Sequence, residues 1–239
     1  MKAIILAAGI GSRLGKIRPK SLTMLPSGET IIENQIKILR NCGIKEILIV
    51  VGFKKELVME EYPSVLYSYN PLFHISNTSK SLLHALKSID LDDVIWLNGD
   101  VFLDKLVITR ICTQQGNAVA VKKKSCGEEE VKYRTNRQNH ICEISKKIRY
   151  PEGEAVGVNK ILKSDFNLFL NCLEECEDQD YFEKAIEKAI SMNAVFYPID
   201  VSDCNCVEVD FKKDLEEIQK ISEIDNTDRL ETMDGGFTR

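Results

Sequence analysis

A glycine-rich loop with two nearby cations is the first group of residues in this chain that could do chemistry. The loop, residues 9–15, follows the apolar run 3–8. Its glycines let the backbone turn sharply and approach a ligand closely, so that successive N–H groups can point at an anion. Arg13 and Lys20 add positive charge to the same short stretch. A site of this kind suits the triphosphate of a nucleotide.

The spacing of the glycines separates this loop from two common nucleotide-binding motifs. Gly15 comes one residue too late for the dinucleotide pattern G-x-G-x-x-G, and the loop lacks the G-K-[ST] that a P-loop requires. The second apolar run ends in Gly52-Phe53 rather than in an acid that would bind a ribose, which disfavours a dinucleotide-dependent oxidoreductase. Because tight turns use glycines in many folds, the loop by itself leaves a purely structural role open.

Three carboxylates could hold a cation against bound phosphates. Asp100 comes shortly after the apolar run 94–97, and in an open parallel sheet ligands bind beyond the carboxyl ends of the strands. Glu208 and Asp210 lie two residues apart around a predicted strand, 207–209, so their side chains share one face. Carboxylates in such a position repel each other unless a cation lies between them or one is protonated. We expect a metal site here, with an ordinary turn aspartate as the alternative for Asp100.

Cysteine usage offers a second metal-binding hypothesis. The chain has eight cysteines, and two pairs are close in sequence, Cys172 with Cys176 and Cys204 with Cys206. Neither spacing is the C-x-x-C of a zinc ribbon, and the N-terminus shows an apolar strand without a secretion signal. We therefore expect reduced, structural cysteines rather than a zinc site.

The elements that must position the candidate residues alternate between strands and helices. The N-terminal half predicts strands at 3–8, 46–51, 65–69, 94–97 and 118–121, and helices at 30–42, 54–62, 79–89 and 104–115. The continuous apolar runs of the strands indicate that both sheet faces are covered by helices. This order predicts an α/β fold, Rossmann-like, with a mixed, mainly parallel sheet flanked by helices.

The C-terminal half departs from this alternation. It predicts a hairpin (131–135 and 140–145) and strands at 155–161, 195–199 and 207–209. It also predicts two helices that begin at the N-caps Ser164 and Asp180, with Glu183 completing a capping box after Asp180. A closing helix is predicted at 213–224. We predict a single domain, residues 1–224. The tail, 225–239, lacks periodicity, and we expect it to be mobile or to order only against a partner.

Charge and hydropathy narrow the class of partner. The 239 residues carry a formal net charge of −5, which argues against nucleic acid or an anionic membrane as the main partner. No run reaches the roughly eighteen apolar residues of a membrane span. We expect a cytoplasmic protein with small-molecule ligands, and we leave its oligomeric state, including a homodimer, open.

The two-part string LAAGIGSRL and RPKSL resembles the opening motif of the sugar-phosphate nucleotidyltransferase superfamily, whose members join a nucleoside monophosphate to a phosphorylated small molecule. LNGD, which ends at Asp100, is similar to the metal-binding segment of that superfamily. EVD, from Glu208 to Asp210, is similar to the E-x-D segment of its cytidylyltransferase branch. The resemblance implies Mg²⁺ on Asp100, Glu208 and Asp210. It also implies a catalytic pair, Arg13 on the triphosphate and Lys20 on the α-phosphate.

The segment 70–82 is similar to the corresponding segment of phosphocholine, aminoethylphosphonate and inositol-phosphate cytidylyltransferases, whereas hexose thymidylyl and uridylyl enzymes carry a Gly-Thr-rich segment there. This similarity implies CTP ahead of other NTPs. The polar side chains of the segment could read a base edge or cap the helix. The nucleotide-binding residues that we expect are Leu6, Ala7, Ala8, Gly9, Gly11, Ser12, Arg13, Lys20, Asn77 and Ser81.

The acceptor site rests on fewer residues. Lys147, in ICEISKK, aligns with the lysine that many superfamily members place on the phosphate of the acceptor, and Lys146 is the neighbouring alternative. We expect Lys147 and Gly157 to bind the acceptor under a small β-rich extension, about residues 122–161. An exposed hairpin lysine is the structural alternative. Phosphocholine, an aminoalkylphosphonate, a polyol phosphate and a sugar 1-phosphate all remain open as acceptors.

The implied reaction transfers a nucleoside monophosphate, CMP from CTP ahead of others, to a phosphorylated or phosphonylated small molecule and releases pyrophosphate. Two alternatives stay open. One is a sugar-1-phosphate nucleotidyltransferase that uses another NTP, and the other is a nucleotide-sensing protein that has the fold but no turnover. The complete set of two cations and three carboxylates favours an enzyme.

Overall fold

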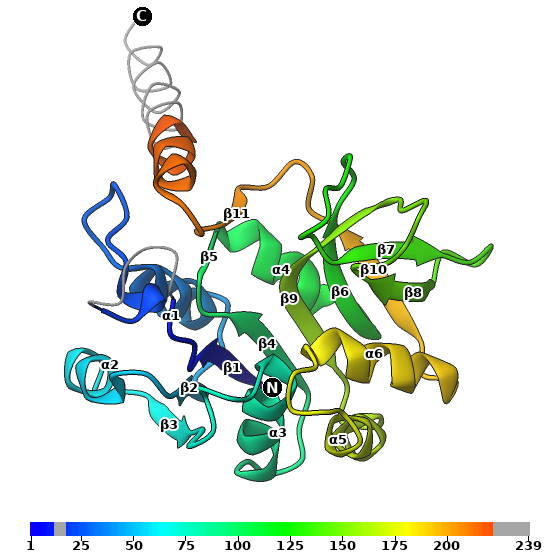
Figure 1. Cartoon of the computed structure of the whole chain (residues 1–239), viewed down its shortest axis with the longest axis horizontal. Coiled ribbons are helices and arrows are strands. Elements are labelled where there is room, and N and C mark those ends of the chain that lie inside the picture. Colours follow the sequence, from blue (N-terminus) through cyan, green and yellow to red (C-terminus); the bar gives the residue numbers. More distant parts are fainter. Residues whose placement is uncertain (12–17, 222–239) are drawn as a thin grey trace, which may run out of the picture.

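One large mixed sheet dominates the computed structural model, which describes residues 1–11 and 18–221 (Figure 1). Its strands are β1 (Lys2–Ala7), β2 (Ile47–Val51), β3 (Leu66–Tyr69), β4 (Val94–Asn98), β6 (Asn117–Lys122), β7 (Lys132–Thr135), β8 (Ile141–Ser145), β9 (Gly153–Ile161) and β10 (Phe196–Asp200). They follow the order β10-β6-β9-β4-β1-β2-β3, with the β7–β8 hairpin paired to β9. β9 runs antiparallel to β4 and β6, whereas the other neighbours in this order are parallel.

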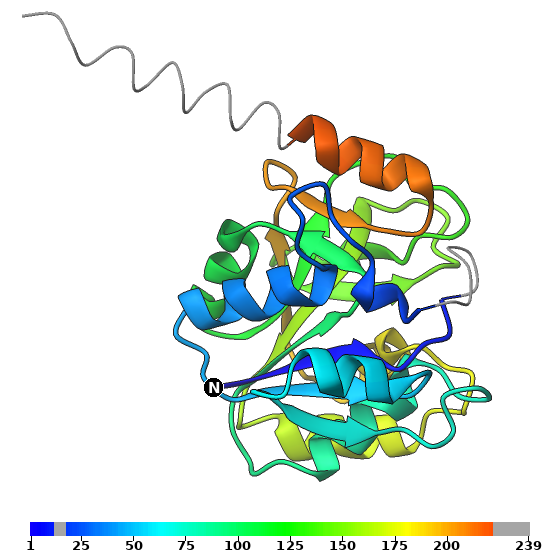
Figure 2. The same ribbon diagram turned by 90° about the vertical axis from the view of Figure 1, so that its left-hand side faces the viewer.

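Helices cover both faces of the sheet (Figure 2). They are the 3₁₀ helix η1 (Lys20–Leu22), α1 (Ile31–Asn41), α2 (Lys55–Glu61), α3 (Thr78–Lys87), α4 (Lys105–Thr113), α5 (Phe166–Glu174), α6 (Phe182–Ser191) and a further helical stretch at 212–221. Ala3 and Ile5 of β1 pack into a core with α1, α2 and α4. Ile4 and Leu6 pack into a second core with α3, α5 and α6. Both faces are therefore buried, and the predicted α/β fold is confirmed.

A second, two-stranded sheet joins distant parts of the chain. β5 (Val101–Leu103) pairs antiparallel with β11 (Cys206–Glu208), and Val101 lies opposite Glu208. The sequence did not predict β5, because three residues are too few to show a period and their partner strand is far away in sequence. The pairing brings the end of β11 beside the end of β4.

Three predicted features differ in detail. β9 is a central strand of the main sheet rather than part of an extension, because its last five residues are buried between two neighbours. Only the β7–β8 hairpin stands beside the main strand order. The N-caps of α5 and α6 are Asp165 and Tyr181, one residue after the predicted Ser164 and Asp180.

Some predictions fall on residues that the structure does not describe. Ser12, Arg13 and the tail 225–239 lie outside the described ranges. Within 1–11 and 18–221, no helix is both long enough and apolar enough to pass through a membrane.

Candidate active site

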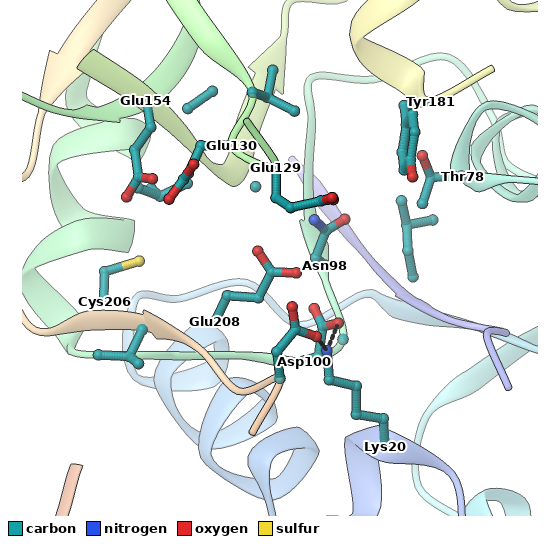
Figure 3. Close-up of a pocket in the computed structure, with 18 of the residues that line it drawn as sticks. Lys20, Thr78, Asn98, Asp100, Glu129, Glu130, Glu154, Tyr181, Cys206 and Glu208 are labelled. Carbon is teal, nitrogen blue, oxygen red and sulfur yellow. Dashed lines mark hydrogen bonds and ion pairs between the residues drawn. The ribbon is translucent and has the colours of Figure 1, made fainter. Parts of the chain in front are cut away.

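A cavity of about 1090 Å³ opens at the carboxyl ends of β1 and β4 (Figure 3). Its walls come from the glycine-rich loop, η1, the strand ends of both sheets, the hairpin region and the start of α6. Ligands of open α/β sheets bind at this edge. The topology therefore assembles side chains from both ends of the sequence around one cavity.

Lys20 reaches the cavity from η1, and Gly11 makes room for it. Gly11 has a φ of +62°, and a Cβ at this position would lie 2.9 Å from the Cβ of Lys20. Only glycine combines this backbone conformation with so close an approach. The two halves of the sequence motif, the glycine-rich loop and the lysine that follows it, therefore meet in space.

Three carboxylates converge beside Lys20. Asp100 follows β4, Glu208 ends β11, and Asp210 comes two residues later. One oxygen of each carboxylate lies within 4.8 Å of an oxygen of each of the others. The backbone N–H of Val209 donates to the carbonyl oxygen of Asp100 at 2.9 Å and continues the β5–β11 pairing. The small sheet is thus the element that unites the carboxylates.

Lys20 supplies a counter-charge for this acidic group. Its Nζ donates to Asp100 Oδ2 at 2.6 Å and also to Asp210 Oδ1. Burial disfavours the ammonium, but the two carboxylates outweigh burial and hold the pKa of Lys20 above its ordinary value. Glu208 projects into the open cleft, yet surrounding protein atoms desolvate its carboxyl. This desolvation, followed by the charge of Asp100, raises the pKa of Glu208 to about 7. One lysine therefore does not balance the three carboxylates.

The donor set fits a hard divalent cation such as Mg²⁺. Mg²⁺ prefers oxygen ligands and usually binds through one or two carboxylates together with substrate phosphates. Asp100, Glu208 and Asp210 form the one cluster of three or more potential metal ligands found among residues 1–11 and 18–221.

The cysteine pairs cannot share a zinc ion. Cys172 and Cys176 lie in the core on one face of the main sheet. Cys204 and Cys206 lie in the core on the other face. All four thiols are free and buried, which agrees with the structural role that the sequence indicated.

Asn98 is a site residue that the sequence did not single out. It lies between the carboxylates and the start of α6 (Figure 3). Its side chain packs against Gly157, which has a φ of +74° and whose Cβ, if present, would lie 2.6 Å from Asn98 Nδ2. Asn98 Oδ1 is buried and has no hydrogen-bond partner in the described part of the chain. Gly157 therefore lines the cavity and also gives Asn98 the space to present an oxygen to a ligand.

The expected nucleotide- and acceptor-binding residues divide into two groups. Leu6, Ala7, Gly9, Gly11, Lys20, Asn77 and Gly157 line the cavity. Ala8 does not, because its side chain packs in the core, and Ser81 is held away by a hydrogen bond from Asn70 Nδ2 at 3.0 Å. Lys147 is exposed outside the cavity, whereas Lys146 lines it, because successive side chains after β8 point in different directions.

The start of α6 forms a wall that the sequence did not predict. The backbone N–H of Phe182 donates to Thr78 Oγ1 at 3.1 Å and joins α6 to α3. The Nζ of Lys146 lies over the ring of Tyr181, 4.8 Å from its centroid. Glu183 also lines the cavity. The one signal for this wall in the sequence is the spacing of Asp180 and Glu183, which predicts a capping box instead.

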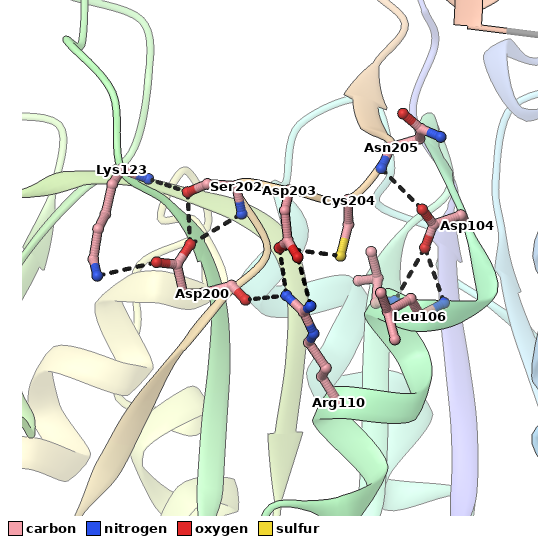
Figure 4. A network of polar contacts seen from close by, with 10 residues as sticks. Asp104, Leu106, Arg110, Lys123, Asp200, Ser202, Asp203, Cys204 and Asn205 are labelled. Carbon is pink, nitrogen blue, oxygen red and sulfur yellow. Dashed lines mark hydrogen bonds and ion pairs between the residues drawn. The ribbon is translucent and has the colours of Figure 1, made fainter. Parts of the chain in front are cut away.

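A polar network outside the cavity fixes the turn that leads into β11 (Figure 4). Arg110 of α4 donates to both carboxylate oxygens of Asp203, at 2.5 and 2.7 Å, and to the carbonyl oxygen of Asp200 at 2.8 Å. At the other end of the turn, Asp104 Oδ2 accepts from the backbone N–H of Asn205 at 2.9 Å. The network therefore anchors the segment that delivers Glu208 to the carboxylate cluster.

Comparisons with known proteins agree with this architecture. The CMP-5'-(3-aminopropyl)phosphonate synthase of Streptomyces rubellomurinus is 35% identical over 133 residues, which cover 52% of this chain and 21% of that protein. The choline-phosphate cytidylyltransferase of Streptococcus pneumoniae is 48% identical over 110 residues, which cover 41% of this chain and 47% of that protein. The alignments thus span about a fifth to a half of the length of these curated relatives.

A solved structure shares the fold over nearly the whole chain. The inositol-1-phosphate CTP transferase from T. maritima superposes with a TM-score of 0.76 at 20% identity, over 93% of this chain and 96% of that chain. The model of the MobA-like NTP transferase domain matches residues 3–162, which include the glycine-rich loop, Lys20 and Asp100. The chain therefore belongs to the MobA-like NTP transferase family.

Proposed function

We propose that this protein transfers CMP from CTP to a phosphorylated or phosphonylated small molecule and releases pyrophosphate. The observation that carries the proposal is the meeting of Lys20 with Asp100, Glu208 and Asp210 in one cavity beside the glycine-rich loop. The preference for CTP rests on the relatives that use cytidine nucleotides.

In the proposed reaction, an oxygen of the acceptor phosphate or phosphonate attacks the α-phosphorus of CTP in line. A new P–O bond forms to the acceptor, and the bond between the α-phosphorus and the bridging oxygen breaks, so that pyrophosphate leaves with the electron pair. The nucleophile is already anionic, which makes a general base unnecessary. The protein must position two mutually repelling anions and stabilise the negative charge that grows on the bridging oxygen.

The residues of this chain divide that work. Gly9, Gly11 and Lys20 line the cavity. In the proposed complex, backbone N–H groups of the loop bind the phosphates and the ammonium of Lys20 contacts the α-phosphate. Lys20 can exchange the carboxylates for phosphate oxygens because both are anions at its Nζ. We assign Arg13, which lies outside the described residues, to the triphosphate by its place in the motif.

Mg²⁺ would be held by Asp100, Glu208 and Asp210. When bound, it neutralises phosphate charge and favours departure of pyrophosphate. Without it, the three carboxylates would repel the triphosphate, since Lys20 balances only part of their charge.

The proposal is tested by a substrate matrix with pyrophosphate release as the readout. Each of CTP, UTP, GTP, ATP and dTTP is combined with phosphocholine, 2-aminoethylphosphonate, inositol 1-phosphate and glucose 1-phosphate in the presence of Mg²⁺. We expect release above the acceptor-free rate only with CTP and one or more of the first three acceptors. Release with UTP or dTTP and glucose 1-phosphate would instead identify a sugar-1-phosphate enzyme. Tight NTP binding without release in any pair would identify a nucleotide sensor.

A further inference from the structure

Glu183 is a buried acid in the cavity with an unused oxygen. It lies in the first turn of α6 and is only 7% exposed, yet it lines the cavity. Its Oε2 has no hydrogen-bond partner within residues 1–11 and 18–221. A buried polar atom without a partner destabilises a protein, so such an atom in a cavity wall calls for a partner such as a ligand.

The neighbours of Glu183 do not neutralise it. Lys146 is the cation whose charge acts on it, but its Nζ is engaged over the ring of Tyr181 and lies 3.6 Å from Glu129. Thr78 Oγ1 accepts a hydrogen bond from the backbone of Phe182. Burial without an ion pair raises the pKa of Glu183 to about 7. Among residues 1–11 and 18–221, the carboxylate form therefore has no ion-pair partner.

The carboxyl group of Glu183 restricts which chemical group of a ligand can lie against it. A phosphate dianion has no hydrogen to donate to Oε2 and would be repelled by the carboxylate, so we do not place a substrate phosphate against Glu183. A trimethylammonium group has no N–H to donate and would leave Oε2 without a hydrogen bond, whereas a primary ammonium has three.

The charge of the whole cavity separates an ammonium from a hydroxyl. The described cavity lining carries nine carboxylates and five lysines. A ligand hydroxyl would satisfy Oε2 but would leave this excess of negative charge unchanged. A ligand ammonium would donate to Oε2 and would also offset part of this negative charge.

We infer that Glu183 receives a protonated primary amine on the acceptor, beside the ring of Tyr181. The inference rests on the proposed nucleotidyl transfer and deepens it by naming the acceptor class, an aminoalkyl phosphate or phosphonate. Glu183 would be a specificity-determining residue that touches the acceptor at the end opposite its reacting oxygen.

The test compares three acceptors of equal chain length, namely 2-aminoethylphosphonate, 2-hydroxyethylphosphonate and ethylphosphonate, with phosphocholine as a fourth. The enzymes are the wild type, Glu183→Gln and Glu187→Gln. Glu187 lies on the same helix, and its partner is Lys184 on the surface at 2.9 Å, which makes it a matched control. Steady-state kinetics give kcat and KM separately for acceptor and CTP, and a thermal melt confirms that each variant is folded.

We expect the wild type to favour the amine over the other two phosphonates by about 10- to 100-fold in kcat/KM, the range of a hydrogen bond to a charged group. Glu183→Gln should lose most of this preference through a higher KM for the amine, while the KM for CTP stays unchanged. Glu187→Gln should behave as the wild type. Three results would overturn the inference: an unchanged preference in Glu183→Gln, a wild-type preference for phosphocholine or the hydroxyl compound, or a rise in the KM for CTP alone. The last would place Glu183 on the base.

A binding measurement keeps this test independent of turnover. If no NTP–acceptor pair releases pyrophosphate, the proposed function fails, but calorimetric titration of the same four compounds into the full chain still tests the subsite. Tighter binding of the amine by the wild type than by Glu183→Gln supports it, and equal binding overturns it. Turnover of glucose 1-phosphate with no preference for the amine would support nucleotidyl transfer but contradict the amine subsite.

Discussion

Lys20 sets the charge balance of the site at the scale of single residues. It pairs with Asp100 and Asp210, which come from segments far apart in sequence, and Gly11 packs closely against it. Such a lysine can serve either the fold or the reaction, and a substitution distinguishes these roles. If Lys20 is catalytic, its substitution should reduce turnover far more than it reduces stability.

Lys20→Ala should lower kcat by about 10²- to 10³-fold, the usual cost of removing one group that stabilises transition-state charge. In the presence of Mg²⁺ its melting temperature should stay close to that of the wild type, because Mg²⁺ can still compensate the carboxylates. The control is Lys37→Ala, which removes an exposed lysine of α1 that pairs with Glu29. Pyrophosphate release at the wild-type rate by Lys20→Ala would exclude a catalytic lysine.

Glu183 should make stability depend on pH. Burial raises its pKa from 4.5 to about 7, so the folded state binds its proton more tightly than the unfolded state does. The stabilising contribution of the protonated form is complete below about pH 4.5 and is lost as the pH rises through about 7. The loss amounts to about 3 kcal/mol.

Glu183→Gln should remove this dependence, so that the variant is more stable than the wild type at pH 8 and differs less from it at pH 5. Urea unfolding at both pH values measures the difference, and Glu187→Gln provides the baseline. A constant difference between wild type and Glu183→Gln across this range would mean that Glu183 does not titrate there.

At the scale of elements, the small β5–β11 sheet is the part on which the carboxylate cluster depends. It holds Glu208 opposite Val101, and the turn before it is anchored by the contacts of Arg110 and Asp104. Asp203 is exposed and Arg110 is half-buried. We therefore expect this ion pair to affect local order more than global stability.

Arg110→Gln should loosen the turn 201–205 and the strand that follows it. We expect faster amide hydrogen exchange at residues 206–208 and a higher Mg²⁺ requirement for turnover, with little change in melting temperature. Arg134→Gln, which breaks an exposed pair with Glu143 on the hairpin, should change neither property. Unaltered exchange at 206–208 in Arg110→Gln would show that the β5–β11 pairing orders this segment by itself.

Sequence reasoning succeeded for elements whose burial is uniform and failed where a distant segment decides. β1 was predictable, because a strand buried on both faces must be apolar throughout, and so was the position of Asp100 just beyond β4. β5 was not, since its pairing depends on β11. The start of α6 was misplaced because the backbone of Phe182 uses Thr78, from another helix, in place of a local cap. Lys146 and Lys147 are neighbours, and the sequence alone does not tell which of them points into the cavity, because this depends on the register of β8.

At the scale of the whole molecule, the core is independent of the site. The two apolar layers on the faces of the main sheet are buried with no contribution from Glu208 or Asp210, which lie at the edge of the cavity. Lys20 pairs with two of the three carboxylates and offsets part of their charge. We therefore expect that loss of the metal or of a site carboxylate affects ligand binding and turnover without unfolding the protein.

Removal of divalent cations with EDTA should abolish turnover but leave the circular dichroism spectrum and the melting temperature nearly unchanged. Added Mg²⁺ should restore turnover, and Mg²⁺ with CTP together should raise the melting temperature, because both bind only the folded chain. Unfolding in EDTA would mean that the cation holds the fold together.

The most direct test of the carboxylate-and-lysine site is Mg²⁺-dependent pyrophosphate release from CTP, measured side by side for the wild type, Asp210→Asn and Asp90→Asn. Asp90 is exposed and does not line the cavity, so it controls for the loss of a carboxylate. We predict equal rates for the wild type and Asp90→Asn, and a rate at least about 100-fold lower for Asp210→Asn. Equal rates for all three proteins would contradict the account, because the site would then release pyrophosphate without one of the carboxylates that define it.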